Sequence, residues 1–273
     1  MISFFKFILL LILFVYIIYG CFLYYIQENI IFYPVPYNEE EIKYIKNQTK
    51  QFDFKKTQID DKIITYWENK IESNQIIFYF GGNAENTNYT VLELLEYPEL
   101  LKFKWILINY PGYNGSNGKP SEKSFYEYAL SIYQKFFTQQ INTNKIIILM
   151  GRSIGTGVVT FLASNVRCDK LILITPFDSI ENIAKKFYPL YPTSIFLKHK
   201  FPSYKYIQNI NIPILILSAE KDEIIPRNST EKLIEYIKNK KLLKYYIIPD
   251  TYHNTISEHY LYWQYLKKFI LED

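Results

Sequence analysis

Glycine is scarce in this chain, so the few positions that carry it indicate where the backbone needs a residue without a side chain. Nine glycines in 273 residues are roughly 3%, less than half of the average usage of about 7%. We expect such a chain to keep glycine where the backbone needs a positive φ or must approach another group closely. Gly20 lies in an apolar segment. The other eight form three clusters, Gly81-Gly82, Gly112/Gly115/Gly118 and Gly151/Gly155/Gly157, where we look for a functional site.

Cysteine is also scarce, and neither positive nor negative charge is in large excess. Two cysteines, Cys21 and Cys168, cannot build a disulfide framework, and no C-x-x-C spacing offers a zinc or redox site. The net charge of +4, from 31 basic and 27 acidic residues, comes without an arginine-rich stripe, so we expect no nucleic-acid partner. With 49% hydrophobic and 21% charged residues, the chain is expected to fold rather than stay disordered.

An uncharged apolar segment lies near the N-terminus. Phe7–Ile26 has the length, about 20 residues at about 1.5 Å each, that crosses a hydrocarbon core of about 30 Å. We therefore predict a single-pass membrane protein, with an anchor over residues 1–26 and one catalytic domain over residues 27–273. The alternative is a lipoprotein modified at Cys21, although Tyr19 fits such a cleavage site poorly. The lysines around the segment leave its orientation open.

Short β-rich apolar runs alternate with helical patterns after this segment. From the third run onward they are continuously hydrophobic, as expected of parallel strands covered on both faces. The predicted strands are Gln51–Gln58, Ile63–Glu68, Gln75–Phe80, Trp105–Tyr110, Lys145–Met150, Leu171–Thr175, Pro213–Ser218 and Leu243–Ile248. The predicted helices are Asn86–Tyr97, Ser121–Gln139, Ile154–Val166, Ser229–Lys238 and Ile256–Leu271.

This alternation predicts an α/β fold with a mostly parallel eight-stranded sheet and helices on both faces. The first two strands are close enough to form an antiparallel hairpin around Asp60-Asp61. Asn228-Ser229-Thr230-Glu231 offers a helix start. The segment between the sixth and seventh strands, Pro176–Ile212, is too short for a full helical lid.

The pentapeptide Gly151-Arg152-Ser153-Ile154-Gly155 carries the strongest chemical signal. It follows a predicted strand and opens a helix, which is the setting in which G-x-S-x-G exposes a nucleophilic serine on a tight turn. The glycines flank Ser153 because a β-carbon at either position would collide within so tight a turn. Ser153 is therefore the candidate nucleophile.

A serine hydroxyl needs a base, and the base needs an orienting acid. Of the three histidines, only His253 follows a strand at the carboxyl edge of the sheet, whereas His199 and His259 are expected to be structural. Asp222, in the loop after the penultimate strand, is the favoured acid if the chain order Ser, Asp, His holds. Asp178, one strand earlier, is the alternative acid.

Three other acidic residues in the loops near the histidine and the aspartate are expected to have no part in the reaction. We expect Asp250 to turn toward its own backbone at the end of a strand, and Glu220 and Glu223 to be solvated loop charges.

The loop Gly81–Asn86, between a predicted strand and helix, is the candidate for the oxyanion hole. Charge that develops on a carbonyl oxygen needs backbone N–H donors fixed in advance. We expect these donors to be the amides of Ile154, after the nucleophile, and of Asn83. No G-K-[ST] or G-x-G-x-x-G follows any strand, so we predict no phosphate-binding loop, no cofactor and no metal.

Taken together, these segments resemble the minimal-lid α/β-hydrolases, which include membrane-tethered acyl-protein thioesterases, lysophospholipid hydrolases and related serine peptidases. The resemblance runs from about Gln27 to the C-terminus. Its carriers are Glu28–Pro34, Gly82–Asn86, Asn109–Ser116, Pro120–Glu122, Gly151–Gly157, Thr175–Phe177, Lys221–Pro226 and His253-Asn254.

The resemblance implies a triad of Ser153, Asp222 and His253 that cleaves an ester or thioester through an acyl-enzyme. The expected partner is an acylated or ester substrate (a small molecule, a lipid or a protein), reached from the membrane. Two alternatives stay open: a serine peptidase or amidase with the same triad, and a non-catalytic binding protein. The chain departs from the family at Gly81, where relatives usually carry histidine.

Overall fold

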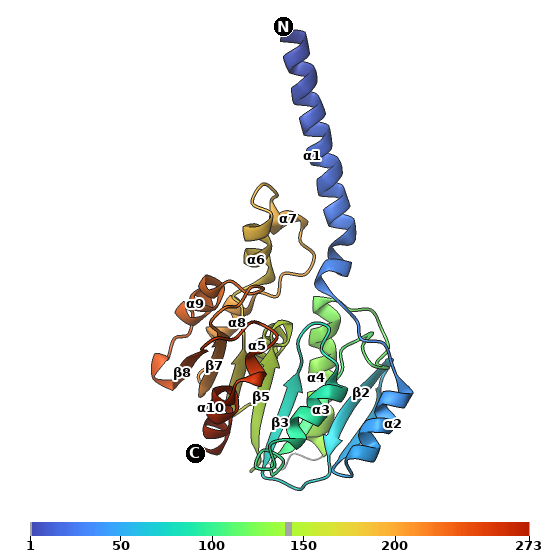
Figure 1. Ribbon diagram of the computed structural model, residues 1–273, viewed down its shortest axis with the longest axis vertical. Coiled ribbons are helices and arrows are strands. Elements are labelled where there is room, and N and C mark those ends of the chain that lie inside the picture. The colour runs from blue at the N-terminus through green and yellow to red at the C-terminus, as the bar shows by residue number, and fades with distance from the viewer. Residues whose placement is uncertain (1, 140–143, 273) are drawn as a thin grey trace.

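The computed structural model describes residues 2–139 and 144–272. It contains one long helix at the N-terminus that projects from an α/β domain (Figure 1). Met1 and Asp273, the outer limits of the predicted anchor and catalytic domain, lie outside the described residues. The division of the chain at residue 26, which lies within the N-terminal helix, stays a prediction.

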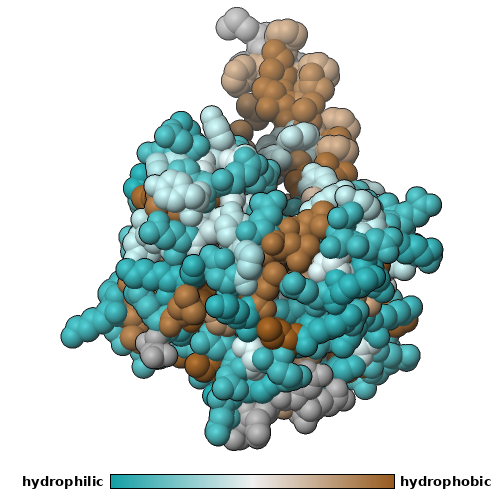
Figure 2. Space-filling view, turned by 60° about the horizontal axis from the view of Figure 1, so that its bottom comes forward, coloured by the Kyte–Doolittle hydropathy of each residue, from teal (hydrophilic) through white to brown (hydrophobic). Residues whose placement is uncertain are grey.

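Helix α1 (Ile2–Ile31) extends beyond the predicted span Phe7–Ile26 at both ends, through Lys6 on one side and the polar residues 27–29 on the other. The part from Phe4 to Ile31 has the length and composition of one membrane crossing, and its most apolar stretch buries no side chain within the protein. Figure 2 shows the difference in character: α1 is covered by hydrophobic side chains, whereas the face of the domain in view is largely hydrophilic.

Eight strands form one sheet in the order β1-β2-β4-β3-β5-β6-β7-β8. The strands are β1 (Phe52–Ile59), β2 (Lys62–Asn69), β3 (Gln75–Phe80), β4 (Lys104–Ile108), β5 (Ile146–Arg152), β6 (Lys170–Ile174), β7 (Ile214–Ala219) and β8 (Leu243–Ile248). β1 pairs with β2 in an antiparallel hairpin that turns at Asp60, which has a φ of 54°, and β2 is antiparallel to β4. The remaining neighbours are parallel, so the predicted sheet and hairpin are confirmed.

The five predicted helices are present, with corrected ends. They are α3 (Thr87–Leu95), α4 (Glu122–Gln139), α5 (Ile154–Asn165), α9 (Arg227–Glu235) and α10 (Tyr260–Leu271). The start predicted for α9 at Asn228–Glu231 is wrong, because the helix already begins at Arg227. Pro226 precedes it with a φ of −58°, a value already suited to helix entry. The last helix is shorter than predicted, because a separate 3₁₀ turn, η2 (Ile256–Glu258), precedes it.

Several short elements were not predicted. They are α2 (Glu39–Gln48), α6 (Ile180–Phe187), α7 (Thr193–Phe196), α8 (Ser203–Ile207) and the 3₁₀ turn η1 (Lys240–Leu242). Three of them, α6, α7 and α8, lie in residues 176–212, which we call the cap segment. In Figure 1, α6 and α7 stand above the sheet on the side from which α1 leaves the domain.

Two hydrophobic cores, one on each face of the sheet, hold these layers together. Along β3, Ile76, Phe78 and Phe80 join a cluster that includes residues of α4, α5 and α8. The alternate residues Ile77 and Tyr79 join a second cluster with residues of α2, α3 and α10. Because successive side chains of a strand point to opposite faces, a continuously apolar strand must be covered on both sides.

Candidate active site

Ser153 lies on a tight turn between β5 and α5. Its backbone has a φ of 52° and a ψ of −120°, which a residue other than glycine adopts only under strain. The flanking glycines have no room for a side chain: a β-carbon on Gly151 would lie 2.4 Å from the Gly155 carbonyl oxygen, and one on Gly155 would lie 2.1 Å from that of Phe80. The Ser153 amide donates to the Ile174 carbonyl at 2.9 Å. The turn is thus fixed on several sides, and the hydroxyl it carries is only partly buried.

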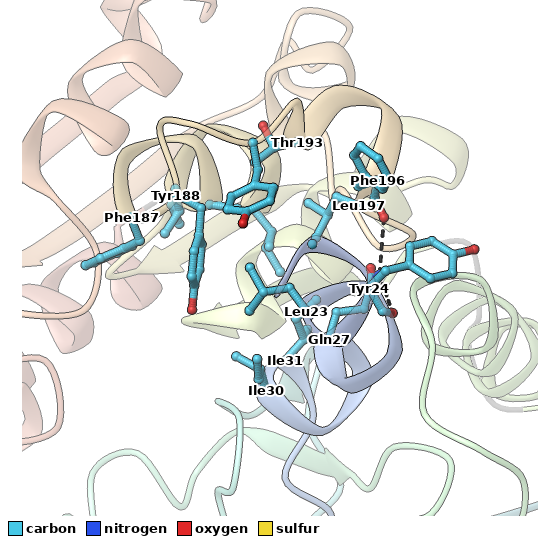
Figure 3. Close-up of a pocket in the computed structure, with 15 residues that line it drawn as sticks. Leu23, Tyr24, Gln27, Ile30, Ile31, Phe187, Tyr188, Thr193, Phe196 and Leu197 are labelled. Atoms are coloured by element: carbon cyan, nitrogen blue, oxygen red, sulfur yellow. Dashed lines mark hydrogen bonds between the residues drawn. The ribbon is translucent and has the colours of Figure 1, made fainter. Parts of the chain in front are cut away.

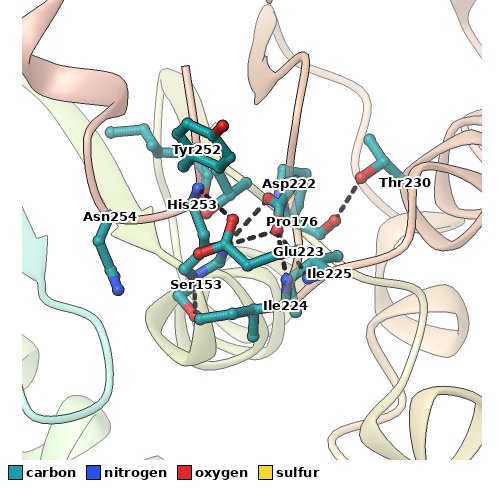
Figure 4. Close-up of polar contacts among 12 residues, drawn as sticks. Ser153, Pro176, Asp222, Glu223, Ile224, Ile225, Thr230, Tyr252, His253 and Asn254 are labelled. Atoms are coloured by element: carbon teal, nitrogen blue, oxygen red, sulfur yellow. Dashed lines mark hydrogen bonds and ion pairs between the residues drawn. The ribbon is translucent and has the colours of Figure 1, made fainter. Parts of the chain in front are cut away.

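The structure brings Ser153, His253 and Asp222 together from three separate loops (Figure 4). The Ser153 Oγ lies 2.9 Å from the His253 Nε2, and the His253 Nδ1 lies 2.9 and 3.0 Å from the two Asp222 carboxylate oxygens. An ionised carboxylate only accepts hydrogen bonds, so the Nδ1 carries the proton and the Nε2 is left to accept from the serine hydroxyl. His253 is 3% exposed, so this chain of hydrogen bonds is largely shielded from water.

The loop residues around Asp222 hold it and the histidine in place. One oxygen of Asp222 also accepts from the amides of Ile224 and Ile225, at 3.0 and 2.7 Å. Glu223 accepts from the His253 amide at 3.1 Å. Glu223 is exposed, as expected of a loop charge, and in addition it ties the aspartate loop to the histidine loop.

Other charges of these loops also have partners. Asp250 pairs with Lys221 at 2.8 Å instead of turning to its own backbone, and Glu220 accepts from the Asp250 amide at 2.9 Å. The ion pair corrects the interpretation of Asp250, whereas Glu220 is exposed, as predicted for a loop charge. Both contacts join the loops after β7 and β8, which carry Asp222 and His253.

Asp178, the alternative acid, lies elsewhere. It is 1% exposed and accepts hydrogen bonds from the Ser229 hydroxyl and the Asn182 side chain. Its own amide donates to the Ser229 Oγ at 3.2 Å. Asp178 therefore connects the start of the cap segment to α9, while the carboxylate that reaches His253 belongs to Asp222.

The other two histidines have structural positions. His259 is the N-cap of α10, and its Nδ1 accepts from the Leu261 amide at 3.2 Å. His199 is buried where α1 meets the domain, and its Nδ1 accepts from the Glu122 amide at 3.3 Å. Burial lowers the pKa of His199, an effect that Glu28, 3.6 Å from its Nε2, offsets only in part.

The predicted oxyanion loop is braced by Glu85. One carboxylate oxygen accepts from the Gly82 amide at 2.7 Å, and the other accepts from the hydroxyls of Tyr79 and Thr90 at 2.6 and 3.0 Å. A β-carbon on Gly81 would lie 2.9 Å from the Glu85 carboxyl carbon. The glutamate thus occupies the space that a side chain at Gly81 would need. Glycine fits at this position, where relatives usually carry histidine.

Of the two predicted amide donors, Ile154 directly follows Ser153, and Asn83 follows Gly82 in a loop that passes close to the serine. The position of a Gly82 β-carbon is 3.6 Å from the Ser153 Cβ, so the loop passes directly over the serine. Ile154 is the first residue of α5, where a helix leaves its amides without intrahelical partners. The Asn83 side-chain oxygen accepts from the Tyr33 amide at 2.9 Å and from the Tyr113 hydroxyl at 3.0 Å, which orients the residue.

Arg152, next to the nucleophile, connects the serine turn to the histidine loop. Its guanidinium donates to the Asn254 carbonyl at 2.9 Å and to that of His253 at 3.4 Å, and it lies 4.0 Å from Glu85. Burial opposes the charge of Arg152, but the surrounding acids, Glu85 first, raise its pKa above the usual value. The arginine therefore stays cationic and links the three loops of the site.

Sequence reasoning named the three residues of the predicted triad but missed these supporting residues. Arg152 and Glu85 both lie inside motifs that the sequence singled out; the hydrogen-bond partners of Arg152 are about a hundred residues away, whereas those of Glu85 are within six residues but form no recognisable motif. Within the residues that the structure describes, no cluster of three or more histidine, cysteine or acidic side chains is arranged to bind a metal ion.

Proteins with known sequences include several relatives. An uncharacterized membrane protein of Saccharomyces cerevisiae is 28% identical over 214 residues, which are 76% of this chain and 74% of that protein. A lysophosphatidylserine lipase of Danio rerio is 30% identical over 196 residues, 63% of this chain and 49% of the lipase. An α/β-hydrolase domain-containing protein 17C of Xenopus tropicalis is 33% identical over 162 residues, 59% of this chain and 50% of that protein. The chain thus spans only about half the length of the last two. No protein-family model matches the chain.

Among solved structures, an esterase of Pyrococcus furiosus superposes with a TM-score of 0.67. The match covers 88% of this chain and 98% of the esterase, at 16% sequence identity. An α/β-hydrolase of Vibrio vulnificus gives a TM-score of 0.68, with 86% of each chain covered and 16% identity. At this level of identity the likeness concerns the fold, and it agrees with the topology described above.

Proposed function

The chain belongs to the α/β-hydrolase superfamily, and from this premise we propose that it is a membrane-anchored serine hydrolase that cleaves the ester or thioester of an acylated substrate. The observation that supports the proposal most is the continuous hydrogen-bonded series from Ser153 through His253 to Asp222. The helix α1 and the membrane-protein relative in yeast agree in making it a single-pass membrane protein.

In the proposed reaction, the Ser153 Oγ attacks the acyl carbonyl carbon while His253 takes its proton. Asp222 holds the imidazole in the right tautomer and stabilises the imidazolium that forms. The amides of Ile154 and Asn83 donate to the oxygen that becomes negative, which is the main electrostatic contribution to such reactions. His253 then protonates the leaving alcohol or thiol, and water releases the acid from Ser153 by the same steps in reverse.

Ester and thioester cleavage is favoured over the peptidase alternative by the apolar surroundings. The cap segment carries exposed aromatic and aliphatic side chains, and α1 keeps the domain at the membrane. The lipase among the relatives acts on a lipid ester, as its name states. A lipid or lipid-linked acyl group is the substrate class that fits this position.

A fluorophosphonate probe on the purified full-length protein tests the proposal. The probe reacts covalently with a serine only where a base activates it, so we expect labelling of the wild type and none of Ser153→Ala. Ser164→Ala, on the outer part of α5, is the matched control and should label normally. An unlabelled wild type, or a Ser153→Ala variant that still labels, would favour the non-catalytic alternative.

A further inference from the structure

A groove of about 410 Å³ lies between α1 and the cap segment (Figure 3). Leu23, Ile30 and Ile31 of α1 form one wall, and Ile183 and Phe187 of α6 stand opposite. The lining is almost entirely apolar, and the volume is within the range of roughly 300–1,000 Å³ that is usual for small-molecule sites.

Two sets of contacts fix α1 against the cap segment on either side of this groove. Near the domain, the Gln27 amide donates to the Phe196 carbonyl at 3.1 Å and its oxygen accepts from the Lys198 amide at 2.7 Å. About three helical turns further out, the rings of Tyr16 and Tyr191 stack with their centroids 4.6 Å apart, and each hydroxyl donates to a carbonyl of the other segment. The groove is therefore held open by specific hydrogen bonds.

The outer end of the groove lies at the level of the membrane span. Tyr16, which contacts the cap segment, is in the middle of the apolar helix. The cap residues beside it, Leu190 and Ile195, are each 78% exposed, an arrangement expected of a surface that contacts lipid. Lys186 of α6 is also exposed and is suited to lipid phosphates near such a surface.

At the inner end of the groove, residues that follow or precede its walls along the chain contact elements of the candidate active site. Two residues after Ile31, the Tyr33 amide donates to the Asn83 side chain of the oxyanion loop. On the opposite wall, Ile180 follows closely after Phe177, whose ring lies 3.2 Å from the position of a Gly157 β-carbon in the helix behind Ser153. The chain thus continues from one wall to the oxyanion loop and from the other to the helix that begins after Ser153.

We propose that this groove binds a single acyl chain of a membrane lipid and presents its ester to Ser153. The inference rests on the proposed function and adds a binding site to it, in which the membrane helix forms one wall. An acyl chain can enter sideways from the bilayer without crossing water, because lipid tails and the side chains of the groove are similarly apolar. At the rim, the Gln27 side chain and the Tyr191 hydroxyl are occupied by the contacts that hold the walls, and the rest of the lining is mostly apolar, which matches an apolar chain.

Hydrolysis by the full-length protein in detergent micelles tests the proposal. Ala184 lines the groove, and Ala184→Trp should fill it. We expect kcat/KM for a palmitoyl lysophospholipid to fall by about tenfold or more, with that for p-nitrophenyl acetate changed less than about twofold. Lys185→Trp adds the same bulk at the next, exposed position of α6 and should leave both values near those of the wild type.

Equal losses for both esters, or no loss for either, would overturn the proposal for the groove while leaving the hydrolase function in place. Hydrolysis of a palmitoylated peptide thioester but not of the lysophospholipid would show that the occupant is not a lipid. If the wild type hydrolyses none of these substrates, the proposed function itself fails.

A second measurement does not depend on turnover or on a variant that alters the groove. Ser153→Ala, with the groove intact, is illuminated with a palmitoyl lysophospholipid analogue that bears a photoreactive group at the end of its chain. We expect crosslinks on groove residues such as Leu23 and Ile183, removed by an excess of unmodified lipid. Crosslinks confined to residues of α1 that face away from the cap segment would contradict the assignment.

Discussion

Ser153, His253 and Asp222 come from loops that are far apart in sequence, yet each follows directly after a strand of the parallel sheet. Because carboxyl ends of parallel strands meet at one edge, the sequence could place all three residues there. The choice between Asp222 and Asp178 could not be made from spacing alone, since both follow strands. It required the observation that the Asp178 carboxylate accepts hydrogen bonds from Ser229 and Asn182.

The two aspartates should behave differently when changed to asparagine. Asp222→Asn keeps the shape but cannot hold the Nδ1–H of His253, so we expect kcat for p-nitrophenyl acetate to fall about 10³- to 10⁴-fold with little change in Tm. Asp178→Asn should leave the chemistry nearly intact and lower Tm, because it weakens a buried hydrogen-bond network. A larger loss of kcat in Asp178→Asn than in Asp222→Asn would move the acid to the earlier strand.

Among the elements, the strands and most of the longer helices were predictable, whereas the ten-residue helix α2 and the short helices of the cap segment were not. Continuous apolar runs and long helical patterns located all the strands and the major helices. Helices α6, α7 and α8 have eight, four and five residues, too few for a helical period to be recognised. Their form depends on contacts with α1 and α5, which no local pattern contains.

The loop between β3 and α3 offers a test of how a single structural element contributes to the proposed reaction. Gly81→Ala places a β-carbon against the Glu85 carboxylate, and Glu85→Ala removes that carboxylate, so each change releases the Gly82 amide. We expect each to lower kcat by about 10- to 100-fold, because small displacements of an oxyanion loop are costly. The double variant should lose less than the product of the two effects, since both break the same contact. Multiplicative losses would mean that Glu85 does not act through this loop.

For the whole molecule, the sequence predicted an anchor and one domain but not how closely they are joined. Helix α1 continues to Ile31 and contacts the cap segment through Tyr16 and Gln27. The residues after it contact the oxyanion loop through Tyr33. The anchor is thus part of the surroundings of the candidate site, a relation that only the three-dimensional structure reveals.

The membrane attachment predicts a simple fractionation result. We expect the full-length protein to stay in the membrane pellet after high-salt and carbonate washes, because the apolar helix spans the bilayer. The intact mass should include the residues before Cys21. A mature chain that begins at a lipid-modified Cys21 would establish the lipoprotein alternative, and release by carbonate would remove both forms of anchoring.

The central claim, that Ser153 and His253 share one proton-transfer step, is tested most directly by kcat for p-nitrophenyl acetate in Ser153→Ala, His253→Ala and the double variant of the folded full-length protein. We predict that each single change lowers kcat by about 10⁴- to 10⁶-fold and that the double variant is no slower than either, because the residues act as a unit. Losses that multiply in the double variant, or near-normal turnover in either single variant, would contradict the account.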